Sequence, residues 1–228
     1  MIRFENVTKK YWDNTLALED VTLKIDPGEF VFLVGPSGSG KTTLLKMLTR
    51  EELPTSGDIF INEYSIVSLK NKFIPKLRRD VSVVFQDFKL LPTKNVFENV
   101  AIALELSNKK DHEIKELVPI ILKKVGLESK ANHFPAELSG GEKQRIAIAR
   151  ALVHNPVVLA ADEPTGMIDP VAAWEIMQLL SEINAEGTTV IVSTHNVDIV
   201  NSFKKRVIEL KNGKIIRDET KGKYHPHG

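Results

Sequence analysis

The chain has 228 residues, with 31 Lys and Arg against 30 Asp and Glu, a length that suits one well-buried α/β domain. Its net charge of +1 at pH 7 gives no overall field that would hold it on nucleic acid or anionic lipid. It contains no cysteine, which excludes disulfides, thiolate catalysis and cysteine-based metal centres and fits a reducing compartment.

Apolar runs in the chain are short. The longest, such as 30–34 and 157–161, have five residues, whereas a helix needs roughly 20 to cross a bilayer. The first residues lack the basic and apolar regions of a secretory signal. We therefore expect no transmembrane helix and a protein that stays in the compartment where it is made.

The first third of the chain predicts short strands that lead into a parallel α/β unit. Apolar and polar residues alternate from Met1 to about Val34 around turn residues, which is typical of strands. Residues 30–34 are all apolar and predict a strand buried on both faces. A glycine-rich turn follows, and then the pattern predicts a helix over 42–49 and a hairpin over 58–66.

The middle of the chain predicts a helical insertion, because helical spacing dominates from about Phe88 to Ala149. The helices are expected over 96–106, 113–125 and 141–152. The α/β pattern then returns with an amphipathic helix over 174–183 and strands over 157–161, 188–193, 207–210 and 214–217. The tail over 221–228, rich in Gly, Lys, His and Pro, predicts fraying.

A phosphate-binding motif lies between the strand and the helix of the first α/β unit. Residues 35–42 read Gly-Pro-Ser-Gly-Ser-Gly-Lys-Thr, which matches G-x-x-x-x-G-K-[ST] in the context that this motif requires. The glycines let backbone N–H groups close around phosphate oxygens, Lys41 reaches the β and γ phosphates, and the Thr42 hydroxyl can ligate Mg²⁺. A plain linking turn would not explain a lysine at a helix start, where the dipole disfavours positive charge. The motif predicts that the chain binds a nucleoside triphosphate, but it does not indicate the class of enzyme.

Acidic residues end a later strand. Asp162 closes the apolar run from Val158, where it can hold Mg²⁺ beside the phosphate loop. Glu163 follows directly and can polarise an attacking water as a general base, or be a solvated acid at a strand end. His195 follows another apolar strand, and a lone histidine there is more often structural than catalytic.

A second anion-binding helix start is predicted at Leu138-Ser139-Gly140-Gly141-Glu142. The serine hydroxyl and the backbone amides of this turn open a helix, although an ordinary N-cap would look the same. If the helical insertion separates the two phosphate-binding turns, the simplest use of both is a head-to-tail homodimer. Each nucleotide would then lie between the phosphate loop of one subunit and the Ser139 turn of the other.

With these motifs in this order, the chain resembles the ATP-binding-cassette (ABC) ATPases over its whole length. The resemblance implies one ABC nucleotide-binding domain over 1–228, with a P-loop, RecA-like α/β core at 1–87 and 155–228. This core would carry an N-terminal antiparallel β subdomain, and a helical subdomain would be inserted at 88–154.

The resemblance also implies site residues, with ATP and Mg²⁺ as the bound groups. Tyr11 would stack on adenine, and Asp169 would cross the dimer interface. The catalytic residues would be Glu163, His195 and Gln86, and the metal ligands Thr42, Gln86 and Asp162. The residues assigned to the nucleotide are Tyr11, Gly35, Pro36, Ser37, Gly38, Ser39, Gly40, Lys41, Thr42, Thr43, Ser139, Gly140, Gly141, Glu142 and Asp169.

Within the family, three stretches are similar to the ATPases of bacterial cell division: 84–94, 95–100 and the ending 213–223. This similarity implies a membrane-protein partner and a place at the cytoplasmic face of the cell membrane. ATP turnover would be relayed through the membrane to peptidoglycan hydrolases outside. Two other functions stay open: the ATPase of a related lipoprotein-release or efflux transporter, and a nucleotide-gated scaffold with slow hydrolysis, against which the intact Glu163 argues.

Two features outside these motifs are candidates for contact with a partner. Phe88, Leu90 and Leu91 follow Gln86 and form either a groove for a cytoplasmic helix of the partner or the core of the helical insertion. A basic cluster over 70–79 faces either anionic groups at the membrane or plain solvent. The tail histidines, His225 and His227, predict no metal site.

Overall fold

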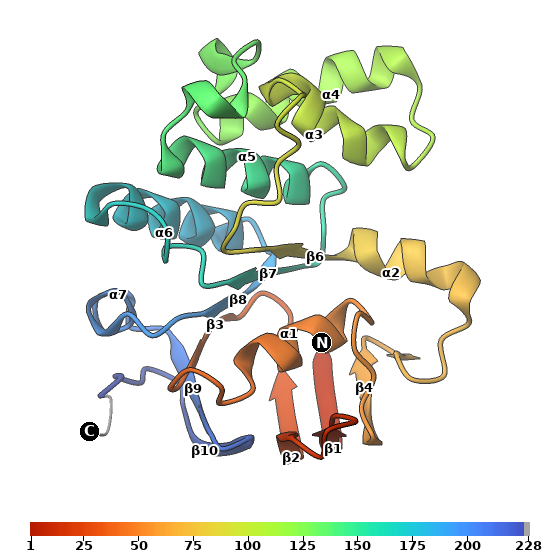
Figure 1. Ribbon diagram of the computed structural model, residues 1–228, viewed down its shortest axis with the longest axis vertical. Coiled ribbons are helices and arrows are strands. Elements are labelled where there is room, and N and C mark those ends of the chain that lie inside the picture. The colour runs from red at the N-terminus through yellow and green to blue at the C-terminus, as the bar shows by residue number, and fades with distance from the viewer. Residues whose placement is uncertain (226–228) are drawn as a thin grey trace.

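Two β-sheets and a group of helices make up residues 1–225, the part of the chain that the computed structural model describes (Figure 1). The first sheet is antiparallel, in the order β2-β1-β4-β5. Its strands are β1 (Ile2–Lys10), β2 (Leu16–Ile25), β4 (Ser56–Ile61) and β5 (Tyr64–Ser65). This sheet is the antiparallel β subdomain that the sequence predicts at the N-terminus.

The second sheet has the order β10-β9-β3-β8-β7-β6, with only β10 antiparallel to its neighbour. Its strands are β3 (Phe30–Val34), β6 (Val81–Val84), β7 (Val158–Asp162), β8 (Thr189–Ser193), β9 (Arg206–Lys211) and β10 (Lys214–Glu219). All five residues of β3 are buried, as expected for a strand covered on both faces.

Seven α-helices surround the sheets in the described residues. They are α1 (Lys41–Leu48), α2 (Ile74–Asp80), α3 (Val96–Glu105), α4 (Asp111–Lys124), α5 (Gly140–Leu152), α6 (Pro170–Ala185) and α7 (Val197–Phe203). Figure 1 shows α3, α4 and α5 gathered at the end of the molecule that lies away from the antiparallel sheet. None of the helices in residues 1–225 is long and apolar enough to cross a membrane.

Successive residues of the parallel strands serve two different cores. Phe32 and Val34 belong to a cluster that includes the apolar faces of α3 to α6, whereas Val31 and Leu33 belong to a cluster with α1 and the antiparallel sheet. This alternation follows from the two-residue period of a strand. The central sheet therefore packs between two apolar layers, one on each face, and the loops at its edge start from strands that are fixed on both faces.

The structure confirms the α/β class and corrects several expectations about single elements. The sequence pattern did not indicate the strand β6 or the helices α2 and α7. β6 has four residues, one of them Ser82, and so carries little periodic signal. The expected fraying is wrong for part of the tail, because Gly222 and Tyr224 are buried. His227 lies outside the described residues.

Candidate nucleotide site

Four loops that carry predicted site residues leave the same edge of the parallel sheet. The phosphate loop follows β3, Gln86 follows β6, Glu163 follows β7 and His195 follows β8. The carboxyl ends of parallel strands are where α/β proteins bind ligands. The sheet order therefore brings residues that are far apart in the sequence to one place.

Glycine is required twice in the phosphate loop. A Cβ on Gly35, whose φ is +141°, would lie 2.1 Å from the carbonyl oxygen of Leu210. A Cβ on Gly40, whose φ is +107°, would lie 2.5 Å from the carbonyl oxygen of Ala17. Gly40 caps α1 with no side-chain hydrogen bond, and no acidic residue stands in the first turn. The amides at the start of α1 are therefore available to an outside anion.

Lys41 lies inside this loop. Its side-chain ammonium donates hydrogen bonds to the carbonyl oxygens of Gly35, at 2.8 Å, and Pro36, at 3.1 Å. Burial lowers the pKa of Lys41, while the nearby Glu163 and Asp162 carboxylates act in the opposite direction. The Ser39 hydroxyl is buried without a hydrogen-bond partner. A buried cation, free amides and an unpartnered hydroxyl fit the phosphates of a nucleotide.

The acidic side of the site is held by Ser193, the last residue of β8. Its hydroxyl donates to a carboxylate oxygen of Asp162 at 2.5 Å and accepts from the backbone N–H of Glu163 at 3.0 Å. That N–H also reaches the Ser193 carbonyl oxygen, at 3.1 Å. Glu163 has a φ of +48°, in the left-handed region that non-glycine residues rarely adopt. The two strand ends therefore fix the direction in which both carboxylates point.

Ser193 was missed by the sequence analysis. The available signal was a polar residue that closes the apolar run Val190-Ile191-Val192. The same signal had singled out Asp162 on β7.

His195 pairs with Glu163. Its Nδ1 lies 3.0 Å from Oε1 of the carboxylate, with the His195 side chain 70% exposed and the Glu163 side chain 16% exposed. The described residues give the other oxygen, Oε2, no hydrogen bond. Glu163 thus has one oxygen engaged and one available to a water molecule, as a general base requires.

Gln86 lies against the loop that follows Glu163. A Cβ on Gly166 would come within 2.7 Å of the Gln86 amide nitrogen, so these two residues are in close contact. The segment after Gln86 is held by Arg150, which donates to the carbonyl oxygens of Phe88, at 2.9 Å, and Lys89, at 2.7 Å.

The residues expected to hold Mg²⁺ have the right chemistry for it. No group of three or more His, Cys, Asp and Glu residues in the part that the structure describes could hold a metal ion by itself. Thr42, Gln86 and Asp162 instead offer one hydroxyl, one amide and one carboxylate. Mg²⁺ is commonly bound by one or two carboxylates together with waters and substrate phosphates, so this sparse oxygen set fits the ion.

Tyr11 lies beside the phosphate loop, with its hydroxyl 3.3 Å from the Thr43 hydroxyl. The Lys9 ammonium lies 4.9 Å from the centre of the tyrosine ring. The expected adenine-stacking residue is thus next to the start of α1.

The Ser139 turn forms a separate cluster. Ser139 caps α5 and accepts from the N–H of Glu142 at 3.2 Å, while the Glu142 carboxylate accepts from the N–H of Ser139 at 2.9 Å. A Cβ on Gly141 would lie 2.8 Å from that of Ala172, and one on Gly140 would lie 3.1 Å from the Met167 carbonyl oxygen. No hydrogen bond within residues 1–225 joins this turn to the phosphate loop.

Asp169 lies next to this second cluster. Its side chain caps α6, accepting from the N–H groups of Val171 and Ala172, each at 3.0 Å.

A P-loop between β3 and a helix, with an Asp-Glu pair at the end of β7 on the same edge of the parallel sheet, defines a P-loop nucleoside triphosphatase. Comparison with known proteins narrows this class. The model of the ABC transporter family matches residues 18–166.

Two curated relatives are named cell division ATP-binding protein FtsE. The one from Bacillus subtilis (strain 168) is 53% identical, covering 98% of both chains. The one from Mycobacterium tuberculosis is 51% identical, again covering 98% of both. Among solved structures, a dimeric post-hydrolysis state of the ATP-binding cassette MJ0796 with ADP and Pi is 39% identical. It has a TM-score of 0.88 and covers 98% of this chain and 100% of that one. The chain belongs to the ABC transporter family and is one of its ATPases.

Proposed function

We propose that the chain is the ATP-hydrolysing subunit of a membrane complex that acts in bacterial cell division. The observation that carries the catalytic part is Glu163 at the strand end beside the buried Lys41, with its backbone N–H bonded to Ser193 and its carboxylate bonded to His195. The names of the relatives from Bacillus subtilis and Mycobacterium tuberculosis support the cellular role.

In the proposed reaction Lys41 and the amides at the start of α1 bind the phosphates of ATP. Thr42, Gln86 and Asp162 would hold Mg²⁺, which when bound neutralises charge on the phosphate oxygens. Oε2 of Glu163 takes the proton of the attacking water, while Oε1 stays on His195 and keeps the carboxylate in position. Ser193 holds Asp162 and the Glu163 backbone at fixed angles, so that little rearrangement is needed on the way to the transition state.

The second half of the site would come from another copy of the chain. We propose a head-to-tail homodimer in which each ATP lies between one phosphate loop and the Ser139 turn of the partner subunit. The dimeric MJ0796 cassette with ADP and Pi supports this arrangement. In it, Asp169 would lie at the interface, and residues 88–154 would move as a helical subdomain relative to the rest of the chain.

The substitution Glu163→Gln tests the catalytic and dimer proposals together. Because it removes the base and leaves Lys41 in place, we expect hydrolysis to fall by about 100-fold or more while ATP binding persists. Light scattering should find a dimer with ATP and a monomer with ADP. A monomeric Glu163→Gln chain with ATP bound would overturn the composite site.

The proposed membrane partner is FtsX, through which ATP turnover would control peptidoglycan hydrolases outside the cell. The chain would then work as a peripheral subunit at the cytoplasmic face of the membrane. A lipoprotein-release or efflux permease is the alternative partner.

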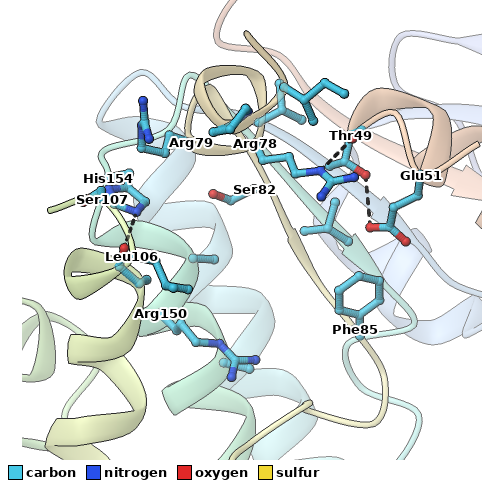
Figure 2. Close-up of a pocket in the computed structure, with 17 residues that line it drawn as sticks. Thr49, Glu51, Arg78, Arg79, Ser82, Phe85, Leu106, Ser107, Arg150 and His154 are labelled. Carbon is cyan, nitrogen blue, oxygen red and sulfur yellow. Dashed lines mark hydrogen bonds between the residues drawn. The ribbon is translucent and has the colours of Figure 1, made fainter. Parts of the chain in front are cut away.

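A hollow of about 500 Å³ beside α2, β6, α3 and α5 supports docking of such a partner. Figure 2 shows Arg78 and Arg79 at one end of this hollow, and Leu106 and Arg150 of α5 near each other farther along it. Leu106 is 79% exposed. Arg78 and Arg79 in the same hollow as an exposed leucine suit a partner segment with acidic and apolar side chains. Of the residues expected to form a groove, Leu90 packs against the core and Leu91 is 39% exposed.

Co-purification identifies the partner. Tagged Glu163→Gln, expressed in the native host and solubilised with ATP, should bring down FtsX. Adding Leu106→Asp, which places a carboxylate opposite an acidic segment, should reduce its recovery, whereas Lys115→Glu on the exposed side of α4 should not. Recovery of a different permease would reject the cell-division role and keep the catalytic assignments.

A further inference from the structure

The tail beyond β10 folds back over β9 and onto α7. Gly222 and Tyr224 are buried, and Tyr224 is only 3% exposed within the cluster that contains Val200 of α7 and Val207 of β9. Figure 1 shows the C-terminal segment running past β9 beside α7. A Cβ on Gly222 would lie 2.8 Å from that of Val207, so glycine lets the chain cross closely over β9.

Tyr224 is joined to α7 by a pair of hydrogen bonds. Its backbone N–H donates to Oδ1 of Asn201 at 2.7 Å, and its carbonyl oxygen accepts from Nδ2 of Asn201 at 3.2 Å. The side-chain amide of Asn201 therefore bonds both the N–H and the carbonyl oxygen of Tyr224, as the backbone of a neighbouring strand would. Together with the buried ring of Tyr224, this pair fixes the middle of a helix that has only seven residues.

α7 in turn carries the loop that positions His195. Asn196 caps the helix by accepting from the N–H of Ile199 at 3.1 Å, and His195 is the residue before this cap. The imidazole is largely exposed, and its one hydrogen bond in the described residues goes to Glu163. On the strand side the backbone before His195 is held by the buried Thr194, whose N–H donates to the carbonyl oxygen of Leu33 at 3.1 Å. On the other side the position of the imidazole depends on the start of α7.

We propose that Asn201 and Tyr224 are positioning residues, and that the C-terminal segment latches α7 so that His195 stays in contact with Glu163. This proposal rests on the proposed role of the Glu163–His195 pair in hydrolysis. Neither residue touches the nucleotide in this account. Their loss lets α7 shift, which misplaces the imidazole and leaves the phosphate loop intact.

The test is a double-mutant comparison of ATP hydrolysis by the purified full-length chain. Asn201→Ala removes the pair of hydrogen bonds at a half-buried site, and we expect kcat to fall by about tenfold with KM for ATP and the melting temperature nearly unchanged. Tyr224→Phe should keep wild-type kcat, because the hydrogen bonds use its backbone and the ring stays in place. Tyr64→Ala, at an exposed tyrosine of β5, is the matched control for Tyr224→Ala.

The deciding measurement adds Asn201→Ala to His195→Ala. If the latch acts through His195, the second substitution lowers kcat no further. An equal further fall in kcat would overturn the latch and leave the proposed catalytic role of His195 intact. A His195→Ala chain with wild-type kcat would instead reject the role of His195, and the latch with it. Tyr224→Ala also lowers the melting temperature because it removes a buried ring, so its kcat is measured well below that temperature; a lower kcat there supports the latch, and wild-type kcat overturns it.

Discussion

The N-termini of α1 and α5 are built in opposite ways, although both carry glycine-rich turns that resemble phosphate sites. α1 begins with Gly40 and Lys41, has no side-chain cap and has no acid in its first turn. α5 begins with a complete capping box in which Ser139 and Glu142 satisfy each other's amides. The first terminus is left open and strained for an outside anion, whereas the second is already closed by its own carboxylate.

This contrast assigns different work to the two turns. We propose that the open terminus, with its buried lysine, supplies much of the free energy of nucleotide binding. The closed terminus holds its shape without a ligand, so a neighbouring subunit would meet a preformed surface.

The largest effect is expected at Lys41. Lys41→Ala removes the buried cation from the open terminus, and we expect ATP affinity to fall by about 30-fold or more, since truncating a buried charged partner costs about 2–5 kcal/mol. Titration with a fluorescent ATP analogue measures it. Lys46→Ala, in the last turn of the same helix, should bind as the wild type does. An equal loss of ATP affinity in both variants would mean that binding depends on positive charge anywhere on α1, and not on the position of Lys41 in the loop.

A smaller and different effect is expected at Ser139. Ser139→Ala opens the capping box and should lower the free energy of unfolding by about 1 kcal/mol, while the monomer keeps its ATP affinity. ATP hydrolysis by the dimer should fall, because in the proposed dimer the Ser139 turn lies against the ATP of the partner subunit. If ATP affinity of the monomer fell as it does for Lys41→Ala, the two termini would not differ in the way described.

The smallest effect is expected at Glu142, and it depends on pH. The hydrogen bond from the Ser139 N–H lowers the pKa of Glu142, with Lys130 adding to this effect. A lowered pKa in the folded state stabilises the protein above the ordinary carboxyl range, and this is lost as pH falls through the lowered value. The melting temperature of the wild type should therefore be higher than that of Glu142→Gln at pH 7, and the difference between the two should shrink in acid. A gap that widened in acid would show that the carboxylate is not held by the cap.

The sequence predicts the parts of the fold that local pattern determines. Residues 30–34 and 157–161 are continuous apolar runs, and the glycine spacing of 35–42 can be found without any partner strand. β6 was missed because its four residues become a strand only through the parallel pairing of Val81 with Val158. Such pairing is a long-range property that periodicity does not report.

The same limit applies to the site. Asp162, Glu163 and His195 stand out as polar residues at the ends of apolar strands. Ser193 does not reveal its role, because its hydroxyl acts on Asp162, which lies 31 residues earlier on the neighbouring strand. Tyr224 was assigned to a frayed tail on composition, and only the tertiary contacts with α7 show it buried.

Cross-linking between subunits shows whether the open terminus of one subunit faces the closed terminus of another. The chain has no cysteine, so Ser37→Cys and Ser139→Cys can each be made as the single thiol of a Glu163→Gln chain. We predict a disulfide-linked dimer when the two variants are mixed with ATP, and none with ADP or with either variant alone. Cross-linking that ignores the nucleotide, or its absence from the ATP-bound mixture, would contradict the account.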